Sequence, residues 1–432
     1  MILISLAPRH GFEPRFTAPK AAVLPLDDRG SLGANSSTSV AFARWIAATA
    51  KLVTVLLRVH FFPGLCLLVL GLGLLVLVVR SLLDFSLHRR LIWLGALAST
   101  ALLIAGYLLE FQRILRHFPT RWWSWLECAS LVETMWLIGL VLALLVWHGA
   151  PQFDPARRRV LQAAGAGLSI APLAATAFGI VRRNNFRVSE VSVPIANLPK
   201  DLDGLRIVQI TDIHLSPFLS EREFAAAIDM ANETRANLAL VTGDLITRGG
   251  DPLDACLRQL ARLRAEAGVL GCLGNHEIYA HAQNYVTEEG RRIGIDFLRH
   301  RSKQLRFGDA AINFAGVDYQ KMHSHYLRGV ERLIVPGVVN VLLSHNPDVF
   351  PVAAAQGYDL TVAGHTHGGQ VDVEILHQHL DVARYYTPFV QGLYRRGNSS
   401  VYVSNGLGTI GVPVRFGAPP EVSVLRLCAI SS

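Results

Sequence analysis

The sequence predicts an α/β domain that is preceded by a helical membrane region, and three observations carry this prediction. Apolar runs of transmembrane length fill much of the first half. After residue 187, short apolar segments alternate with helical ones. The charge changes at the same place, because residues 44–187 hold 15 Lys or Arg against 5 Asp or Glu, whereas residues 188–432 hold 22 against 25. We therefore expect a helical region over residues 44–187 and an α/β domain over residues 188–432.

Residues 1–43 precede both parts. They are polar, contain Pro, Gly and Ser, and show no periodicity, which predicts disorder. The run from Gly11 to Pro14 also back-translates naturally to the T-arm of a transfer-RNA gene. A second hypothesis is therefore that the start codon has been placed too early, and sequencing the N-terminus of the native protein would decide between the two.

Four apolar runs in the first half predict about four transmembrane helices. A hydrocarbon core requires about 20 apolar residues at helical rise. Residues 61–79 and 91–109 carry no charge. Residues 134–147 form a shorter run that extends backwards only past Glu133, and residues 160–181 are richer in Ala and Gly. The chain is thus expected to cross the membrane several times.

The sidedness follows from arginines around the fourth run. Arg157, Arg158 and Arg159 precede it, either as part of a twin-arginine export signal or as a positive-inside cluster. Both alternatives place these residues in the cytoplasm, so the α/β domain would lie on the outer, periplasmic side of a bacterial inner (cytoplasmic) membrane. The opposite orientation is favoured by the basic residues that follow the helix, Arg182, Arg183 and Arg187.

Charge and cysteine content exclude other classes of protein. The formal net charge of +8 does not come from residues 188–432, and no basic stripe with interleaved aromatic residues occurs, so no nucleic acid partner is expected. The five cysteines include no CxxC spacing. They are expected to be small buried apolar residues, and neither a disulfide framework nor a zinc ribbon.

The α/β domain is predicted from its individual segments. Short apolar runs bounded by turn residues predict strands at residues 205–210, 238–242, 269–273, 338–344 and 360–363. Helical spacing predicts helices at residues 221–236 and 253–267, the second one capped by Gly268. This order of strands and helices is typical of an α/β core.

Each of the five strands ends in residues that can bind a metal ion. They are Asp212 and His214, Asp244, Asn275 and His276, His345, and finally His365 and His367. One such Asp is explained by a helix cap, but five strand ends of this kind are not. Because sites form beyond the carboxyl ends of strands, we expect these side chains to converge.

The residue types indicate the chemistry. Carboxylate, amide and imidazole ligands without thiolate suit Mn²⁺, Fe, Zn²⁺ or Co²⁺. A pair such as Asp212 and His214 could reach one ion, and a lone Asp could bridge two. The preceding glycines, Gly243, Gly274 and Gly364, are expected to permit the backbone bends. Two ions about 3.5–4 Å apart can clamp a phosphoryl group and activate water.

The same residues carry a resemblance to a known family. They stand as Asp212-Ile213-His214, Gly243-Asp244, Gly274-Asn275-His276-Glu277, His345 and Gly364-His365-Thr366-His367. This pattern resembles the calcineurin-like metallophosphoesterase family. The run His367-Gly368-Gly369-Gln370 and residues 401–427 look like the membrane-anchored bacterial branch of that family.

The resemblance implies a fold and a role for each position. The fold would be a two-sheet αββα sandwich. A first metal ion would be held by Asp212, His214 and His367, and a second by Asn275, His345 and His365. Asp244 would bridge the two divalent ions. His276 would act as the catalytic residue that protonates the leaving oxygen or stabilises negative charge. Glu277 would either orient His276 or cap the segment that follows.

The expected function is a membrane-anchored phosphohydrolase that cleaves phosphodiester or pyrophosphate bonds. Its partners would be membrane lipids and a phosphorylated small-molecule or lipid substrate, such as an acylated UDP-sugar or a phospholipid. The alternative is a membrane sensor or scaffold whose phosphoesterase domain binds metal without turnover. A third possibility, transport through the helices, is supported only by the interior acid Glu133.

Overall fold

The computed structural model describes residues 63–85, 89–114, 123–149, 155–321, 324–375, 378–381 and 383–430. The chain divides into two units, Met1–Arg58 and Val59–Ser432, and all described residues belong to the second. The predictions made for residues 1–43 therefore lie outside the described residues.

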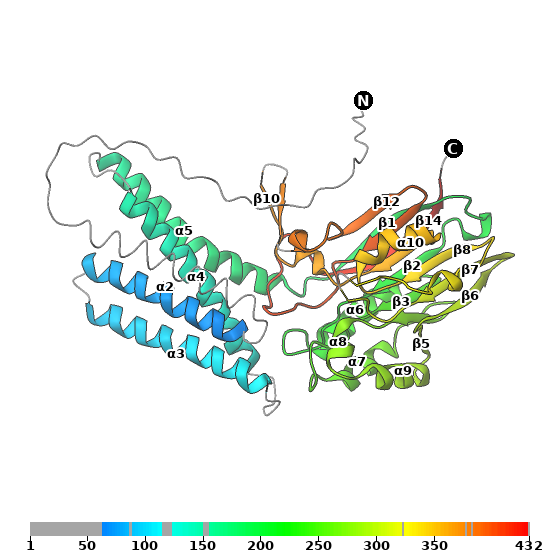
Figure 1. The fold of residues 1–432 in the computed structure, drawn as a ribbon, viewed down its shortest axis with the longest axis horizontal. Helices are drawn as coiled ribbons and strands as arrows, with labels where there is room; N and C mark the ends of the chain where they lie inside the picture. The colour runs from blue at the N-terminus through cyan, green and yellow to red at the C-terminus, as the bar shows by residue number, and fades with distance from the viewer. Residues whose placement is uncertain are drawn as a thin grey trace. The chain divides into compact units, whose positions relative to one another are not determined.

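Among the described residues, four long helices precede strand β1 (Arg187–Ile195) in the chain (Figure 1). They are α2 (Pro63–Phe85), α3 (Arg89–Ile114), α4 (Trp123–Gly149) and α5 (Pro155–Arg182). Each coincides with one of the four predicted apolar runs, so these runs form helices. Among the described helices, the segment Ser124–Leu145 of α4 is long and apolar enough to cross a membrane. The apolar stretches of α2, α3 and α5 are shorter, so the expected number of membrane crossings stays a prediction.

Close packing joins α2, α3 and α4. Leu75, Leu103 and Leu137 share one buried apolar cluster. Gly106 of α3 lies so close to α4 that a Cβ there would come within 2.3 Å of the Ser130 side chain. Small residues at such crossings let helix backbones approach, which is how helices pack where the hydrophobic effect does not drive association.

The α/β domain begins with a six-stranded sheet in the order β1-β14-β2-β3-β4-β5. Its strands are β1 (Arg187–Ile195), β2 (Arg206–Ile210), β3 (Leu238–Thr242), β4 (Val269–Cys272), β5 (Ile295–Phe297) and β14 (Glu421–Ala429). Strands β2 to β5 run parallel, and β14 is parallel to β1 but antiparallel to β2. The last strand of the chain thus completes the sheet that the first strand starts.

The second sheet also has six strands, in the order β12-β13-β9-β8-β7-β6. They are β6 (Arg301–Phe307), β7 (Ala310–Gly316), β8 (Val339–Leu343), β9 (Leu360–Ala363), β12 (Gly392–Arg396) and β13 (Ser399–Val403). Strands β7, β8, β9 and β13 are parallel, and both edge strands are antiparallel to their neighbours. A separate hairpin pairs β10 (Val373–Ile375) with β11 (Gln378–Leu380).

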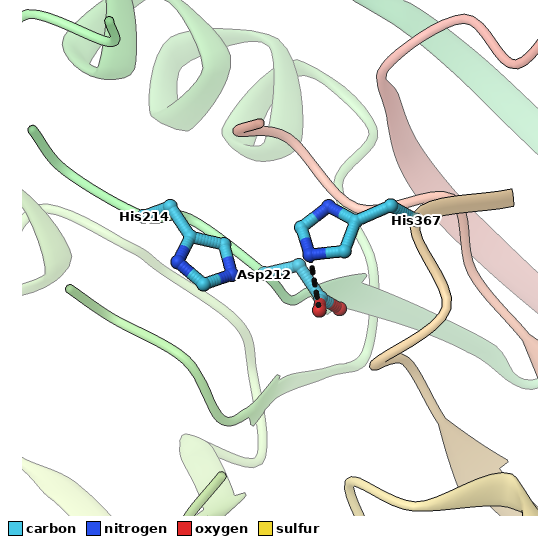
Figure 2. Close-up of side chains that lie close together, drawn as sticks. All are labelled: Asp212, His214 and His367. Carbon is cyan, nitrogen blue, oxygen red and sulfur yellow. Dashed lines mark ion pairs between the residues drawn. The ribbon is translucent and has the colours of Figure 1, made fainter. Parts of the chain in front are cut away.

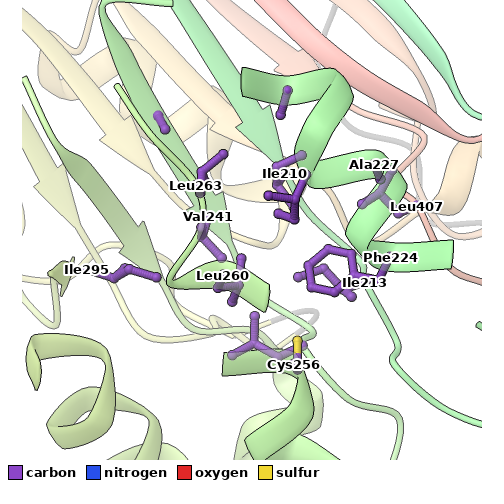
Figure 3. Packing of buried hydrophobic residues seen from close by; sticks show 14 of the residues in the cluster. Ile210, Ile213, Phe224, Ala227, Val241, Cys256, Leu260, Leu263, Ile295 and Leu407 are labelled. Carbon is purple, nitrogen blue, oxygen red and sulfur yellow. The ribbon is translucent and has the colours of Figure 1, made fainter. Parts of the chain in front are cut away.

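Helices cover the outer faces of the two sheets. They are α6 (Glu221–Glu233), α7 (Leu253–Leu260), α8 (Asn275–Tyr279), α9 (Gln283–Arg292) and α10 (Phe350–Gln356). Adjacent residues of a strand point to opposite faces. Accordingly, Val241 packs with Phe224 of α6 in the outer cluster (Figure 3), whereas its neighbour Leu240 packs between the sheets with Phe314. This is the αββα layering that the resemblance implied.

Two details differ from the sequence predictions. Helix α7 ends at Leu260 with Ala261 as its cap, so Gly268 is not the cap of this helix. Gly268 instead has φ 88° and lies directly before β4, where it turns the chain into the strand. The sequence predicted that this helix continues through residues 261–267, but the backbone turns there to bring the chain back to the sheet.

Candidate metal centre

The five predicted strand ends meet at one place, although they belong to two different sheets. Strands β2, β3 and β4 come from the first sheet, and β8 and β9 come from the second. The convergence therefore results from the packing of two sheets against each other, and not from a single sheet edge. All seven predicted ligands lie in this region, and six of them fall into groups whose ligand atoms are within 4.8 Å of one another.

The first group contains Asp212, His214 and His367 (Figure 2). The Nε2 atom of His367 lies 3.4 Å from Oδ1 of Asp212. The Asp212 carboxylate is fully buried and is held by the Thr211 hydroxyl and by the backbone N–H of His365, which donate to it at 2.8 and 3.0 Å. These bonds fix a carboxylate between two imidazole rings, which is the arrangement expected around one metal ion.

The second group contains Asp244, His345 and His365. The Nε2 atom of His345 lies 2.9 Å from Oδ2 of Asp244. A further group joins the same Asp244 with His214 and His276. Asp244 therefore lies close to ligands of both groups, which is the position that a bridging carboxylate requires.

Hydrogen bonds outside the groups set the orientation of the imidazole rings. Nδ1 of His345 lies 2.7 Å from the Thr242 carbonyl, to which it donates. Nδ1 of His214 lies 3.2 Å from the Thr247 hydroxyl. In both rings Nε2 is therefore left facing the carboxylates. Partners of this kind hold metal-binding histidines in the correct tautomer and orientation.

Several buried atoms of the predicted ligands have no hydrogen-bond partner among the described residues. They include Oδ1 of Asn275 and Nε2 of His214. Asn275 begins α8 directly after β4 and is buried, as predicted for a ligand of the second ion. Buried polar atoms are normally satisfied, so such orphaned atoms require an explanation. Two divalent ions, one at each set of predicted ligands, would satisfy these atoms, and the oxygen and nitrogen donor set fits Mn²⁺, Fe, Zn²⁺ or Co²⁺.

Burial controls the protonation of the histidines. It lowers the pKa of His214 to about 3 and that of His365 to about 4. Both rings are therefore neutral at pH 7, as metal binding requires. Burial alone would also lower the pKa of His345, but the carboxylates of Asp244 and Asp212 outweigh it and raise this pKa to about 10. A metal ion must displace that proton.

Several ligand residues adopt backbone conformations that are unusual for residues other than glycine. The left-handed region is occupied by Asp212, His214, Asp244, His365 and His367, with φ between 46° and 75°. Such residues cost on the order of 1–3 kcal/mol each and cluster at functional sites. The ligands themselves therefore make the bends that aim their side chains.

This finding corrects the expected role of the glycines. Of the three preceding glycines, Gly243 alone has a left-handed φ, 92°. Gly274 has an extended backbone, φ −94°, and is needed for space, because a Cβ there would lie 2.1 Å from Oδ1 of Asp244. Gly364 is constrained in the same way by Oδ2 of Asp212, also at 2.1 Å. The sequence correctly marked these positions, but close approach is the reason at two of them.

Glu277 holds two loops of the site together. Its fully buried carboxylate accepts hydrogen bonds from the backbone N–H groups of Asp244, Leu245 and Gly274, at 3.0, 2.7 and 2.8 Å. The bond from Gly274 is that of a helix cap, and the other two fix the loop after β3. Of the two alternatives for Glu277, the structure therefore favours capping of α8, and the same carboxylate also binds the loop after β3. His276 is oriented by the Thr247 carbonyl.

Two tyrosines beside the site were missed by sequence reasoning. The Tyr319 ring lies 5.3 Å from the His365 ring, and the Tyr279 ring lies 5.6 Å from the His276 ring, measured between centroids. Tyr319 follows strand β7 and so occupies a strand end of the same kind as the ligands. Tyr279 lies three residues after His276, at the end of α8. Their positions relative to these elements were the available signals.

The two sheets, the shared carboxylate and the paired histidine groups define a metal-dependent phosphoesterase domain. Residues 205–369 match the calcineurin-like phosphoesterase family. Members of this family are generally metal-dependent hydrolases of phosphoric esters.

Three relatives illustrate the similarity. The metallophosphoesterase YkuE of Bacillus subtilis is 27% identical over 242 residues, which cover 55% of this chain and 84% of YkuE. The metallophosphoesterase Cj0846 of Campylobacter jejuni is 32% identical over 56% of this chain and 63% of its own length. A transmembrane protein with metallophosphoesterase domain from Danio rerio is 29% identical over 56% of this chain and 57% of its own length. The similarity thus spans over half of this chain.

Proposed function

We propose that this protein is a membrane-anchored phosphohydrolase with two divalent metal ions, which cleaves a phosphodiester or pyrophosphate bond. The observation that carries this proposal is the assembly of two groups of ligand atoms, one from Asp212, His214 and His367 and the other from Asp244, His345 and His365. Asn275 completes the second set with an oxygen that has no other described partner. When bound, the ions would supply a clamp for the phosphoryl group and an activated water.

The remaining steps belong to residues of this chain. His276 is nine-tenths buried, and its Nδ1 donates to the Thr247 carbonyl. This bond leaves Nε2 of His276 to contact the substrate, where a protonated ring donates to the leaving oxygen or to a phosphate oxygen. Tyr279 stacks edge-on against His276 and shields it on one side. We assign His276 the role of catalytic residue, and the seven ligands the role of positioning the ions and the phosphate.

We further propose that the substrate is lipid-linked or part of the cell envelope. Helix α4 meets the length and hydropathy requirement of a membrane span, and a vertebrate relative carries the word transmembrane in its name. The catalytic domain follows α5 directly, because β1 begins at Arg187, five residues after the helix ends at Arg182. A site tethered so closely to a membrane favours a substrate in that membrane, such as a phospholipid or an acylated UDP-sugar.

The activity is tested with the purified full-length protein, loaded with Mn²⁺ and assayed on bis(p-nitrophenyl) phosphate and on short-chain phospholipids. His276→Ala is expected to lower kcat by about 10²–10⁴-fold, the usual contribution of a general acid. Metal content, measured by mass spectrometry, is expected to stay at the wild-type level in this variant. Unchanged hydrolysis by His276→Ala would contradict its catalytic role. Metal binding without any turnover by the wild type would support the sensor or scaffold alternative.

We propose that the catalytic domain faces the outer side of the membrane of a bacterial cell. His300 is exposed in the loop before β6, so His300→Cys offers a label site. A membrane-impermeant maleimide is expected to label this variant in intact cells, with the wild type as the measure of background from native cysteines. Labelling only after lysis would place the domain in the cytoplasm, where an acylated UDP-sugar is available as a substrate.

A further inference from the structure

A basic cavity lies where the last turn of α5 meets the loop before β14. Its volume is about 350 Å³. It is lined by eight residues, Phe178, Arg182, Asn185, Arg187, Arg415, Phe416, Gly417 and Pro419. Three of the eight are arginines and none is acidic. None of the eight residues is a predicted metal ligand or the proposed catalytic residue.

Two of these arginines are exposed and available. Arg182 lies over the Phe178 ring, with its guanidinium carbon 4.7 Å from the ring centroid. Arg187 is the first residue of β1, and its backbone N–H donates to the Pro420 carbonyl at 3.0 Å. Neither side chain forms an ion pair with any residue that the structure describes. The ring and the strand therefore hold two cations at the cavity without neutralising them.

The third arginine is buried without a carboxylate partner. Arg415 is 3% exposed, and its two terminal nitrogens donate only to backbone carbonyls, those of His367, Gly406, Gly408 and Ala418. Its Nε has no hydrogen-bond partner among the described residues. Burial lowers the pKa of Arg415 to about 10, so the group is still charged at pH 7. The carboxylates of Asp212 and Glu421 offset part of this effect, but neither forms an ion pair with Arg415 among the described residues. A bound anion near the unpartnered Nε would offset more of the cost of burying this charge.

We propose that this cavity binds the phosphate group of an anionic ligand, and that the ligand is a phospholipid headgroup. Guanidinium groups bind phosphate oxygens through paired, charge-assisted hydrogen bonds. The carboxyl end of a helix carries roughly half a negative charge, which the three arginines outweigh. Phe178 and Phe416 pack edge to face at 6.2 Å and give the cavity an apolar wall for the adjoining lipid. The choice of a lipid as the source of the phosphate rests on the proposed function.

Arg415 connects this cavity to the candidate metal centre. Its backbone N–H donates to the carbonyl of Gly179 in α5 at 3.2 Å, and its side chain donates to the carbonyl of the predicted ligand His367 at 3.1 Å. One residue therefore contacts both the end of α5 and the loop that carries His367. A headgroup in the cavity would lie next to the catalytic site and could place a lipid-linked substrate there.

The binding site is tested by replacing the two exposed arginines in the full-length protein with Arg182→Gln and Arg187→Gln together. Both side chains are exposed, so the variant is expected to fold, whereas Arg415 is left intact. The matched control is Arg264→Gln with Arg291→Gln, which removes the same charge from exposed positions. Arg291 lies on α9, which packs against β5 at the opposite edge of the sheet from β1.

The probes are dioctanoyl phosphatidylglycerol, inorganic phosphate and dioctanoylglycerol, which lacks phosphate. Binding is measured by calorimetry in a neutral detergent after EDTA has removed metal ions, so the metal centre does not contribute. Phosphatidylglycerol is expected to bind the wild type and the control equally, and the double variant at least about tenfold more weakly, because charge-assisted bonds are lost. Dioctanoylglycerol is expected not to distinguish the proteins.

The outcomes separate the source of the phosphate from the existence of the site. Arginine-dependent binding of phosphatidylglycerol alone supports a lipid headgroup, and equal dependence of phosphatidylglycerol and free phosphate supports a site for the anion itself. Arginine-dependent binding of free phosphate alone overturns the lipid assignment. Equal binding of phosphatidylglycerol by the double variant and the control overturns the site. Because metal-free protein is used, loss of the hydrolytic activity proposed above leaves this result readable.

Discussion

Replacing Glu277 by Gln is expected to loosen two loops of the site at once, the loop that carries Asp244 and the loop that carries Asn275. The Glu277 carboxylate is completely buried and accepts three backbone N–H bonds. Oε2 accepts from Asp244 and Gly274, and Oε1 accepts from Leu245. A Gln side chain keeps one acceptor oxygen of the same shape. Its NH₂ group must then face at least one backbone N–H, so that donor and donor meet.

The magnitude follows from these three bonds. A hydrogen bond to a charged acceptor contributes about 1.5–3 kcal/mol, and a buried donor without a partner costs about 1–3 kcal/mol. Burial and the neighbouring Asp244 carboxylate both raise the pKa of Glu277, because both disfavour its charged form. Replacing the charged side chain by neutral Gln removes this unfavourable contribution and so offsets part of the loss of hydrogen bonding. The net loss is expected to be about 2–4 kcal/mol. For a domain of this size, that corresponds to a decrease in Tm of about 5–15 °C.

The assay is thermal unfolding of the full-length protein, followed by the fluorescence of a thiol-independent dye, together with metal content by mass spectrometry. The control is Glu289→Gln, which removes a partly exposed carboxylate that pairs with Arg292. This control is expected to change stability by less than about 0.5 kcal/mol. The Tm of Glu277→Gln is expected to lie about 5 °C or more below that of the control. A Tm within about 2 °C of the control, together with full metal content, would refute the role of Glu277 in joining the two loops.

Two further predictions concern backbone strain and pH. Gly243→Ala places a Cβ 2.5 Å from the backbone nitrogen of Gly274 at φ 92°. It is expected to lower the free energy of unfolding by about 2–5 kcal/mol and to reduce metal content. The control Gly250→Ala has a similar φ of 95° but places its Cβ in open space, so it is expected to lower the free energy of unfolding by only about 1–2 kcal/mol. Wild-type metal content in Gly243→Ala would contradict this. Although burial raises the pKa of Asp296, Arg301 and Lys303 outweigh this effect and lower it. A carboxylate whose pKa is lowered in the fold stabilises it above the ordinary pKa of Asp, and this contribution is lost as pH falls through the lowered pKa. The Tm difference between wild type and Asp296→Asn should therefore be largest above about pH 5 and decrease steadily as the pH falls below the ordinary pKa of Asp. A difference that is constant with pH would exclude this ion pair as its cause.

Several features were determined by the sequence alone. The four apolar runs predicted helices α2 to α5, because a long apolar run has few other stable conformations. The five strand ends predicted the residues that converge at the candidate metal centre. Strand length, turn residues and side-chain chemistry are local properties, and they are written directly into the sequence.

Other features were decided only by the tertiary structure. Gly274 and Gly364 are required because carboxylates pack against them, and Glu277 joins two loops that are separated by about 30 residues of sequence. In the sequence, nothing distinguishes Arg415 from the other basic residues, yet the fold buries it between α5 and the loop that carries His367. Residue spacing along a strand cannot reveal which sheet faces which, because that depends on how the two apolar faces pack together. The sequence thus determined which residues could carry the chemistry, and the packing of the two sheets decided which of them meet.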